Sequence, residues 1–247
     1  MNTSLEKALS KVPEVTLGFW IIKILATTLG ETGGDAVSMS MGLGYLLGTA
    51  IFAVIFLAAV WVQIKATHFH PVIYWTTIIA TTTVGTTLAD FADRSLGIGS
   101  LLLLTLLLLS LFIWHRTLGT ISVQSITTYK AEIFYWVTIM FSQTLGTALG
   151  DWTADTAGLG YAGAAGIFGG LLAIIVLAYF KTNISRTALF WAAFILTRPL
   201  GAVVGDFLDK PMDHGGLELS RYTASAVLLV AIIACTFIFK QRAGKAH

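Results

Sequence analysis

Long apolar stretches alternate with short polar segments along the chain, and one polar pattern recurs at regular intervals. Each recurrence consists of a tryptophan, a glycine ten residues later and an aspartate fifteen residues later. The tryptophans are Trp20, Trp75, Trp136 and Trp191, the glycines are Gly30, Gly85, Gly146 and Gly201, and the aspartates are Asp35, Asp90, Asp151 and Asp206. Because self-similarity of this kind is typical of repeat architectures, the pattern predicts four copies of one structural unit.

Each copy is long enough for two helices that cross a membrane. The tryptophans lie 55, 61 and 55 residues apart, and one helix needs about 20 residues to span the hydrocarbon core. We therefore expect an all-α, polytopic membrane protein with eight transmembrane helices, built as four two-helix repeats within a single membrane domain. The expected spans are 15–35, 43–64, 71–90, 97–115, 131–151, 158–180, 187–206 and 221–240, in repeats at about 12–66, 67–127, 128–182 and 183–242.

The composition supports this fold class. Hydrophobic residues make up 56% of the chain and charged residues 11%, which lies outside the usual range of soluble globular domains. The even-numbered spans are plainly apolar, as in LLLLTLLLLSLFIW, whereas the odd-numbered spans carry threonine, glycine and the aspartate. A charge within the membrane is costly and usually functional, so we expect the chemistry of the protein in the odd-numbered spans.

The distribution of positive charge predicts the orientation. The cations before the first span, between the repeats and in the C-terminal tail are Lys7, Lys11, Lys65, Arg116, Lys130, Lys181, Arg186, Lys240, Arg242 and Lys245. The hairpins within the repeats hold only Arg94, Lys210 and Arg221 as cations, together with nearly all the acids. The positive-inside rule therefore places both termini in the cytoplasm and the acidic hairpins outside. Every repeat then starts on the same side, so the repeats are parallel copies around an axis along the membrane normal.

Other functional classes find little support in the sequence. The single cysteine, Cys235, lies within the last span, and the five histidines do not cluster at the spacing of metal ligands. Motifs for zinc, for phosphate binding and for a nucleophile elbow are missing, so we expect neither enzyme activity nor a cofactor. No basic tract favours nucleic acid and no cleavage site follows the first apolar stretch. The expected partners are the lipid bilayer and an inorganic cation. Whether the protein forms a homo-oligomer is left undecided by the sequence.

The whole pattern resembles a known family. Four tandem copies, each with two spans and the same tryptophan, glycine and aspartate register, extend from Val12 to Phe239. This arrangement is similar to that of bacterial integral membrane proteins described only as a repeat of unknown function. The resemblance implies a multi-pass protein of the inner membrane, and it brings no established chemistry.

Three positions of each odd-numbered span share one helix face. Positions eight, eleven and fifteen after the tryptophan lie on adjacent turns. In the first three copies they hold Thr28, Glu31 and Asp35, then Thr83, Thr86 and Asp90, then Thr144, Thr147 and Asp151. The fourth copy keeps Asp206 but has Pro199 and Ala202 at the other two positions. Parallel repeats can bring these stripes together around the central axis.

We interpret the four aspartates as a layer that binds a cation. Asp35, Asp90, Asp151 and Asp206 are the expected ligands for a metal or other cation, with Glu31 as a fifth and the threonines as a supporting stripe. Carboxylate oxygens suit Mg²⁺, Mn²⁺, Ca²⁺ or protons better than soft metals, and a ring of acids is one way to achieve cation selectivity. The alternative is that each aspartate ends its helix at the membrane interface and bonds the following turn.

Two basic residues lie within odd-numbered spans. Arg198 stands at position seven, where the other copies have Thr27, Thr82 and Gln143. Because an unpaired guanidinium would be costly at this depth, we expect charge pairing with Asp206 or with an acid of a neighbouring repeat. Lys23 lies one turn inside the first span, and we expect it to reach back to the interface, with charge pairing as the alternative.

Further residues are interpreted from their position in the repeat. The second acids, Asp93, Asp155 and Asp209, form either a vestibule that concentrates cations or a solvated loop. The aromatic pairs that begin each odd-numbered span are interpreted as an aromatic belt at the cytoplasmic interface. The glycine at position ten and the small residue four positions later predict close packing between helices.

These features favour a membrane transporter or channel for cations, with divalent metals such as Mn²⁺, Mg²⁺ or Ca²⁺ and coupling to protons as the working hypothesis. The alternative is a membrane protein that does not transport but senses ions or pH, or regulates a partner protein from the membrane. An intramembrane aspartyl protease would need a glycine three residues before the acid, and the aspartates do not have it.

Overall fold

The computed structural model describes residues 11–97, 100–123, 126 and 128–244. These residues form eight long helices, which are α1 (Leu17–Asp35), α2 (Gly44–Lys65), α3 (Pro71–Asp90), α4 (Ser100–Leu118), α5 (Tyr129–Asp151), α6 (Gly160–Lys181), α7 (Arg186–Asp209) and α8 (Arg221–Ile238). The helices coincide with the eight expected spans, and the largest difference at any end is about three residues. Two of the cations used to predict the orientation, Lys7 and Lys245, lie outside the described residues.

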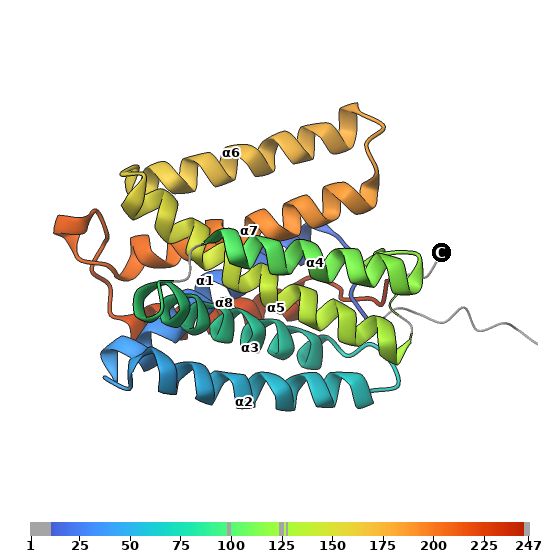
Figure 1. Cartoon of the computed structure of the whole chain (residues 1–247), viewed down its shortest axis with the longest axis horizontal. Coiled ribbons are helices and arrows are strands. Elements are labelled where there is room, and N and C mark those ends of the chain that lie inside the picture. The colour runs from blue at the N-terminus through green and yellow to red at the C-terminus, as the bar shows by residue number, and fades with distance from the viewer. Residues whose placement is uncertain (1–10, 98–99, 124–125, 127, 245–247) are drawn as a thin grey trace, which may run out of the picture.

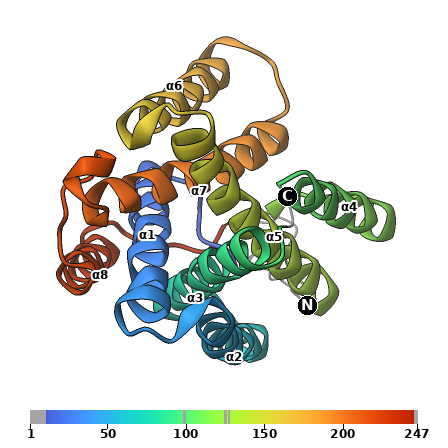
Figure 2. The same ribbon diagram turned by 60° about the vertical axis from the view of Figure 1, so that its left-hand side comes forward.

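The odd-numbered helices form a closed inner ring in the order α1, α3, α5, α7, with α7 in contact with α1 again (Figure 2). Each even-numbered helix lies outside this ring and packs against the odd-numbered helix of the next repeat, so α2 covers α3, α4 covers α5, α6 covers α7 and α8 covers α1 (Figures 1 and 2). A β-bridge between Pro13 and Ala243 joins the two ends of the chain. The four repeats are therefore related in a cycle around one central axis, as parallel copies require.

The repeat glycine allows neighbouring helices of the inner ring to pack closely. At each interface it faces the residue at position seven of the next odd-numbered helix, and an added Cβ at Gly85 would lie 2.7 Å from the Cβ of Gln143. The four contacts are Gly30 with Thr82, Gly85 with Gln143, Gly146 with Arg198 and Gly201 with Thr27. The small residues thus serve helix packing, as the sequence pattern predicts, because they let neighbouring backbones approach.

The aromatic pairs lie in the interior, and the interpretation of them as an interfacial belt is wrong. The first ring of each pair packs against the tryptophan of the next repeat, with ring centroids 5.5 Å apart for Phe19 and Trp75 and 5.9 Å apart for Tyr74 and Trp136. The hydroxyls of Tyr74 and Tyr135 are hydrogen-bonded at 2.7 Å. Because the side chains fill the space between helices, they close the end of the ring that we call the aromatic end.

Six of the described helices, α2, α3, α4, α6, α7 and α8, are long and apolar enough to cross a membrane. The remaining two, α1 and α5, run beside α3 and α7 in the inner ring (Figure 2). Their apolar character is lower because each contains three charged residues, which are Lys23, Glu31 and Asp35 in α1 and Lys130, Glu132 and Asp151 in α5. The fold is therefore that of an all-helical membrane protein made of four two-helix repeats.

Candidate functional site

The four repeat-related aspartates lie at the other end of the ring, which we call the aspartate end. Asp35, Asp90 and Asp206 are buried, and the side chain of Asp151 is 13% exposed. In the first three repeats the helix continues past the aspartate as one π-helical turn, Ala36–Ser40, Phe91–Ser95 or Trp152–Thr156. None of these three aspartate side chains caps the turn. The α-helices of these repeats thus end at the aspartate, as the alternative interpretation expects, but the aspartate side chains do not bond the following turn.

Two basic side chains bridge the aspartates in pairs. Arg94 Nε lies 2.9 Å from Asp90 Oδ1, and Arg94 Nη2 lies 3.6 Å from Asp151 Oδ2. Lys210 Nζ lies 2.7 Å from Asp35 Oδ2 and 3.1 Å from Asp206 Oδ1. Each cation thus joins the aspartate of its own repeat to that of the next. We call the two groups the Arg94 half (Asp90, Asp151 and Arg94) and the Lys210 half (Asp206, Asp35 and Lys210).

The sequence contains a signal for these pairs that our reading of it missed. Arg94 and Lys210 each follow an aspartate of the layer by four residues, the spacing at which opposite charges meet on one helix face. The corresponding residues of the other two repeats are Met39 and Asp155, so only alternate repeats carry the cation. Burial by itself would lower the pKa of Lys210, but Asp206 and Asp35 raise this pKa above its ordinary value. Lys210 therefore stays positively charged.

Additional charged groups adjoin the Lys210 half. Arg221 Nε lies 3.2 Å from Asp209 Oδ2 and 3.8 Å from Asp35 Oδ2. The carboxylates of Glu31, Asp35 and Asp206 each offer an oxygen, and these oxygens lie within 4.8 Å of one another. In the described part of the chain, the Arg94 half has no such group of three. The two halves are thus alike in their bridging cation and unlike in the number of acids around it.

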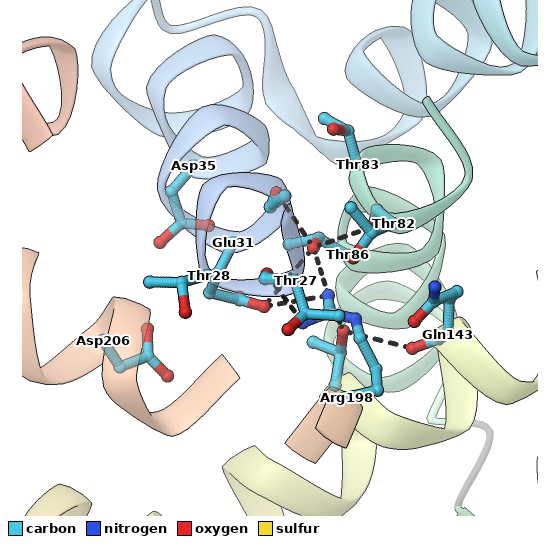
Figure 3. A network of polar contacts seen from close by, with 12 residues as sticks. Thr27, Thr28, Glu31, Asp35, Thr82, Thr83, Thr86, Gln143, Arg198 and Asp206 are labelled. Carbon is cyan, nitrogen blue, oxygen red and sulfur yellow. Dashed lines mark hydrogen bonds and ion pairs between the residues drawn. The ribbon is translucent and has the colours of Figure 1, made fainter. Parts of the chain in front are cut away.

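Arg198 occupies the middle of the ring, one layer deeper than the aspartates. Its side chain is fully buried, and its Nη2 lies 3.0 Å from Glu31 Oε2 and also donates to the hydroxyls of Thr86 and Thr147 (Figure 3). Its Nη1 lies 3.4 Å from the carbonyl oxygen of Thr27. One guanidinium on the fourth repeat therefore contacts the other three. Its acidic partner is Glu31 on a neighbouring repeat, whereas Asp206 pairs with Lys210.

The threonine stripe divides into two sets. Thr86 and Thr147, at position eleven, reach Arg198, and Thr86 Oγ1 also lies 3.3 Å from Glu31 Oε2. The threonines at position eight instead donate to carbonyls of their own helices, Thr28 to Ile24, Thr83 to Ile79 and Thr144 to Met140. Position seven, not position eight, lies between neighbouring helices. A charged residue at position seven of the fourth repeat, Arg198, is the sequence signal that could have identified this position as the inward-facing one.

Lys23 does not reach the membrane interface. Its side chain is fully buried, its Nζ has no hydrogen-bond partner among the described residues, and it lies 4.3 Å from the centroid of the Phe194 ring. No ion pair is found for it within the described ranges either. The expectation that Lys23 extends to the interface is therefore wrong. The position of Nζ over the ring face has the geometry of a cation–π contact.

The second acids do not form one vestibule. Asp93 and Asp155 are exposed, whereas Asp209 is buried and bonded to Arg221. The difference arises because α7 continues as an α-helix through Asp209, while the other odd-numbered helices turn into a π-helical segment after the first aspartate. Only Asp209 is thereby directed into the bundle.

Comparison with known proteins gives a family and no function. The family model described as "Repeat of Unknown Function (DUF347)" matches residues 18–69, 73–120, 134–185 and 189–243. No curated protein and no solved structure is detectably similar to the chain. The four matches cover most of the sequence and repeat in register with the four two-helix units described above. The chain therefore belongs to the DUF347 repeat family.

Proposed function

We propose that the protein is a cation transporter of the inner membrane. The observation that supports this proposal is the position of the four aspartates at one end of the inner ring, where three of them are buried and all four face oppositely charged groups. Acids are rare within membrane proteins and usually mark an ion pathway or a proton relay. Carboxylates brought together from several helices are suited to hard cations.

The closed axis favours a carrier over an open channel. At the aromatic end, Phe19, Tyr74 and Tyr135 are at most 1% exposed, and Arg198 is fully buried in the middle. A cation at the aspartate layer would therefore need a conformational change to continue through the ring. Alternating access by movement of repeats against one another is a common solution in transporters built from repeats.

The orientation follows from the cations of the loops. Lys11, Lys65, Arg116 and Lys181 lie at the aromatic end, so the positive-inside rule assigns that end to the cytoplasm. Both termini are then cytoplasmic, and the aspartate layer faces outward. A cation that enters from outside would meet the aspartate layer first, then Arg198 and then the aromatic end. Import would release it into the cytoplasm, and export would follow the same path in the opposite direction.

The test is ion flux through purified protein in liposomes, screened with Mn²⁺, Mg²⁺, Ca²⁺, Co²⁺, Na⁺ and a pH-sensitive dye for protons. We expect flux of at least one cation, and Asp35→Asn should abolish most of it because this change removes charge and keeps shape. Asp213→Asn is the matched control, since Asp213 is exposed at the same end of the protein. If folded protein passes none of these ions, the proposed function is wrong.

One observation favours a second candidate, an ion or pH sensor without transport. Each of the four aspartates already has a basic partner within the chain, so exchange of these partners could switch the conformation without any ion crossing. A sensor should show cation-dependent protection of the residue 210–220 loop from proteolysis while flux stays at the level of empty liposomes.

A further inference from the structure

The Lys210 half of the aspartate layer adjoins a cluster of three buried acids. We propose that Glu31, Asp35 and Asp206 bind one divalent metal cation there, and that the cation takes the place of the ammonium group of Lys210. This inference rests on the proposed function and makes it more specific, because it identifies one site, one class of substrate and the group with which the substrate competes.

The geometry of the three acids is the first support. Their nearest oxygens lie within 4.8 Å of one another, and oxygens that bind one divalent cation at about 2.0–2.6 Å from it can be at most roughly 5 Å apart. The three residues are 1–3% exposed. They lie along the space between α1 and α7 (Figure 3).

The present occupant is the second support. Lys210 Nζ lies between Asp35 and Asp206, at 2.7 and 3.1 Å. The site therefore already holds a positive group, at hydrogen-bonding distance from two of the three acids. Asp35 Oδ1 is buried and has no hydrogen-bond partner among the described residues. An ammonium leaves this oxygen unused, whereas a metal ion with several oxygen ligands can use it.

The balance of charge favours a divalent ion. Four acids contribute to this region, namely Glu31, Asp35, Asp206 and Asp209. Three basic side chains oppose them, namely Arg198, Lys210 and Arg221. With every group ionised, one negative charge remains. Exchange of Lys210 for an ion of charge two removes this excess, and exchange for a monovalent ion does not.

The exchange needs only side-chain movement. The backbone around Lys210 is fixed, because Leu217 N donates to Phe207 O at 2.8 Å and Glu218 N donates to Lys210 O at 2.9 Å. Lysine carries its charge on a flexible four-carbon chain, so the ammonium can leave the acids while the loop stays folded. Arg94 is less free to leave its acids, since its planar guanidinium contacts Asp90 and Asp151 through two different nitrogens.

The decisive experiment measures binding of Mn²⁺ to purified protein in nanodiscs by electron paramagnetic resonance. Lys210→Gln should bind Mn²⁺ roughly tenfold more tightly than the wild type, because a competing charge close to the site is lost. Lys210→Arg should bind it more weakly, since a guanidinium bridges two carboxylates more firmly. Arg94→Gln should change the affinity less than Lys210→Gln does. Lys65→Gln, which removes an exposed lysine at the aromatic end, is the control for net charge and should leave the affinity unchanged.

The outcomes separate this inference from the proposed function. Wild-type protein that transports a monovalent ion but binds neither Mn²⁺, Mg²⁺ nor Ca²⁺ would overturn the inference and leave the transporter standing. Mn²⁺ binding that Lys210→Gln does not strengthen would overturn the exchange. Tighter binding in Lys210→Gln without any flux would support the site and reject transport. Asp35→Asn and Glu31→Gln should both weaken binding, and the second variant decides the point if the first fails to fold.

Discussion

The two halves of the aspartate layer are built from copies of one repeat but differ in their charged residues. In both, a cation four residues after one aspartate bridges to the aspartate of the next repeat. In the Arg94 half the bridging side chain is 41% exposed, and in the Lys210 half it is 14% exposed. The Lys210 half also adjoins Glu31, Asp209 and Arg221, whereas the ion pairs of Arg94 among the described residues are with Asp90 and Asp151 alone.

This difference shows how a duplicated site can specialise without a change of fold. The Arg94 half contains two acids and one arginine that contacts both, an arrangement suited to holding α3 and α5 together. The Lys210 half adjoins two further acids, Glu31 and Asp209, and its bridging group is a flexible lysine. Arg198 then adds asymmetry in the middle of the ring, because its only carboxylate partner among the described residues is Glu31. The predictions below test this distinction.

The largest effect is expected at the link between the Lys210 half and the centre. Arg198→Met should lower the free energy of unfolding by about 3–5 kcal/mol, because it leaves Glu31 buried without a charged partner. Adding Glu31→Gln should restore much of this loss, as coupled positions do in a double-mutant cycle. Unfolding in detergent, followed by tryptophan fluorescence, measures all the variants. A double variant no more stable than Arg198→Met would show that the pair is not coupled.

Next in size is the comparison of the bridging cations. Lys210→Gln should cost roughly 2 kcal/mol, since Asp206 then loses its basic partner and Asp35 keeps only Arg221, at 3.8 Å. Arg94→Gln should cost about 1 kcal/mol or less because its ion pairs are more exposed. Millimolar Mn²⁺ should then raise the unfolding midpoint of Lys210→Gln more than that of Arg94→Gln, because a ligand stabilises the state that binds it. Equal losses and equal responses to Mn²⁺ would remove the distinction between the halves.

An effect of similar size is expected at the helix interfaces of the two halves. The small residue at position fourteen is Gly205 on α7 and Ala89 on α3. An added Cβ at Gly205 would lie 2.6 Å from the Cβ of Glu31, so Gly205→Ala should destabilise the protein by about 1–3 kcal/mol through overpacking. Ala89→Gly should cost about 1 kcal/mol or less, the usual difference in helix propensity. Thermal unfolding of both variants decides whether the α7–α1 interface is the tighter one.

Much of the fold could be predicted from the sequence because its period is strict. Position ten is glycine in every repeat, and its packing role follows from spacing alone. The inward position of the aromatic pairs could not be predicted in the same way, since an aromatic residue at a helix end suits both an interfacial belt and a packed layer. Only the neighbouring helix decides between them, and the sequence does not state which helix is the neighbour.

The site was predicted in composition but not in its pairing. The acids were identified because a charge in an apolar repeat is conspicuous, and Arg198 for the same reason. Lys210 and Arg94 were assigned to the hairpins within the repeats and not to the aspartate layer, although their spacing from Asp206 and Asp90 indicates a shared helix face. Lys23 was misplaced because nothing in its local sequence reveals that α7 brings Phe194 over it.

The last prediction concerns the side of the membrane on which the two halves lie, and we expect no change in stability or binding. Single cysteines replacing Asp93, next to the Arg94 half, and Asp213, in the loop after Lys210, should both react with a membrane-impermeant thiol reagent added outside cells. A cysteine replacing Lys65 should react only after the membrane is opened, because the cations place the aromatic end in the cytoplasm. All three substituted residues are exposed, and Cys235→Ala provides the background without other thiols. Labelling of the Lys65 position from outside would reverse the orientation. Labelling of the Asp93 and Asp213 positions from opposite sides would separate the two halves and contradict the ring of parallel repeats itself.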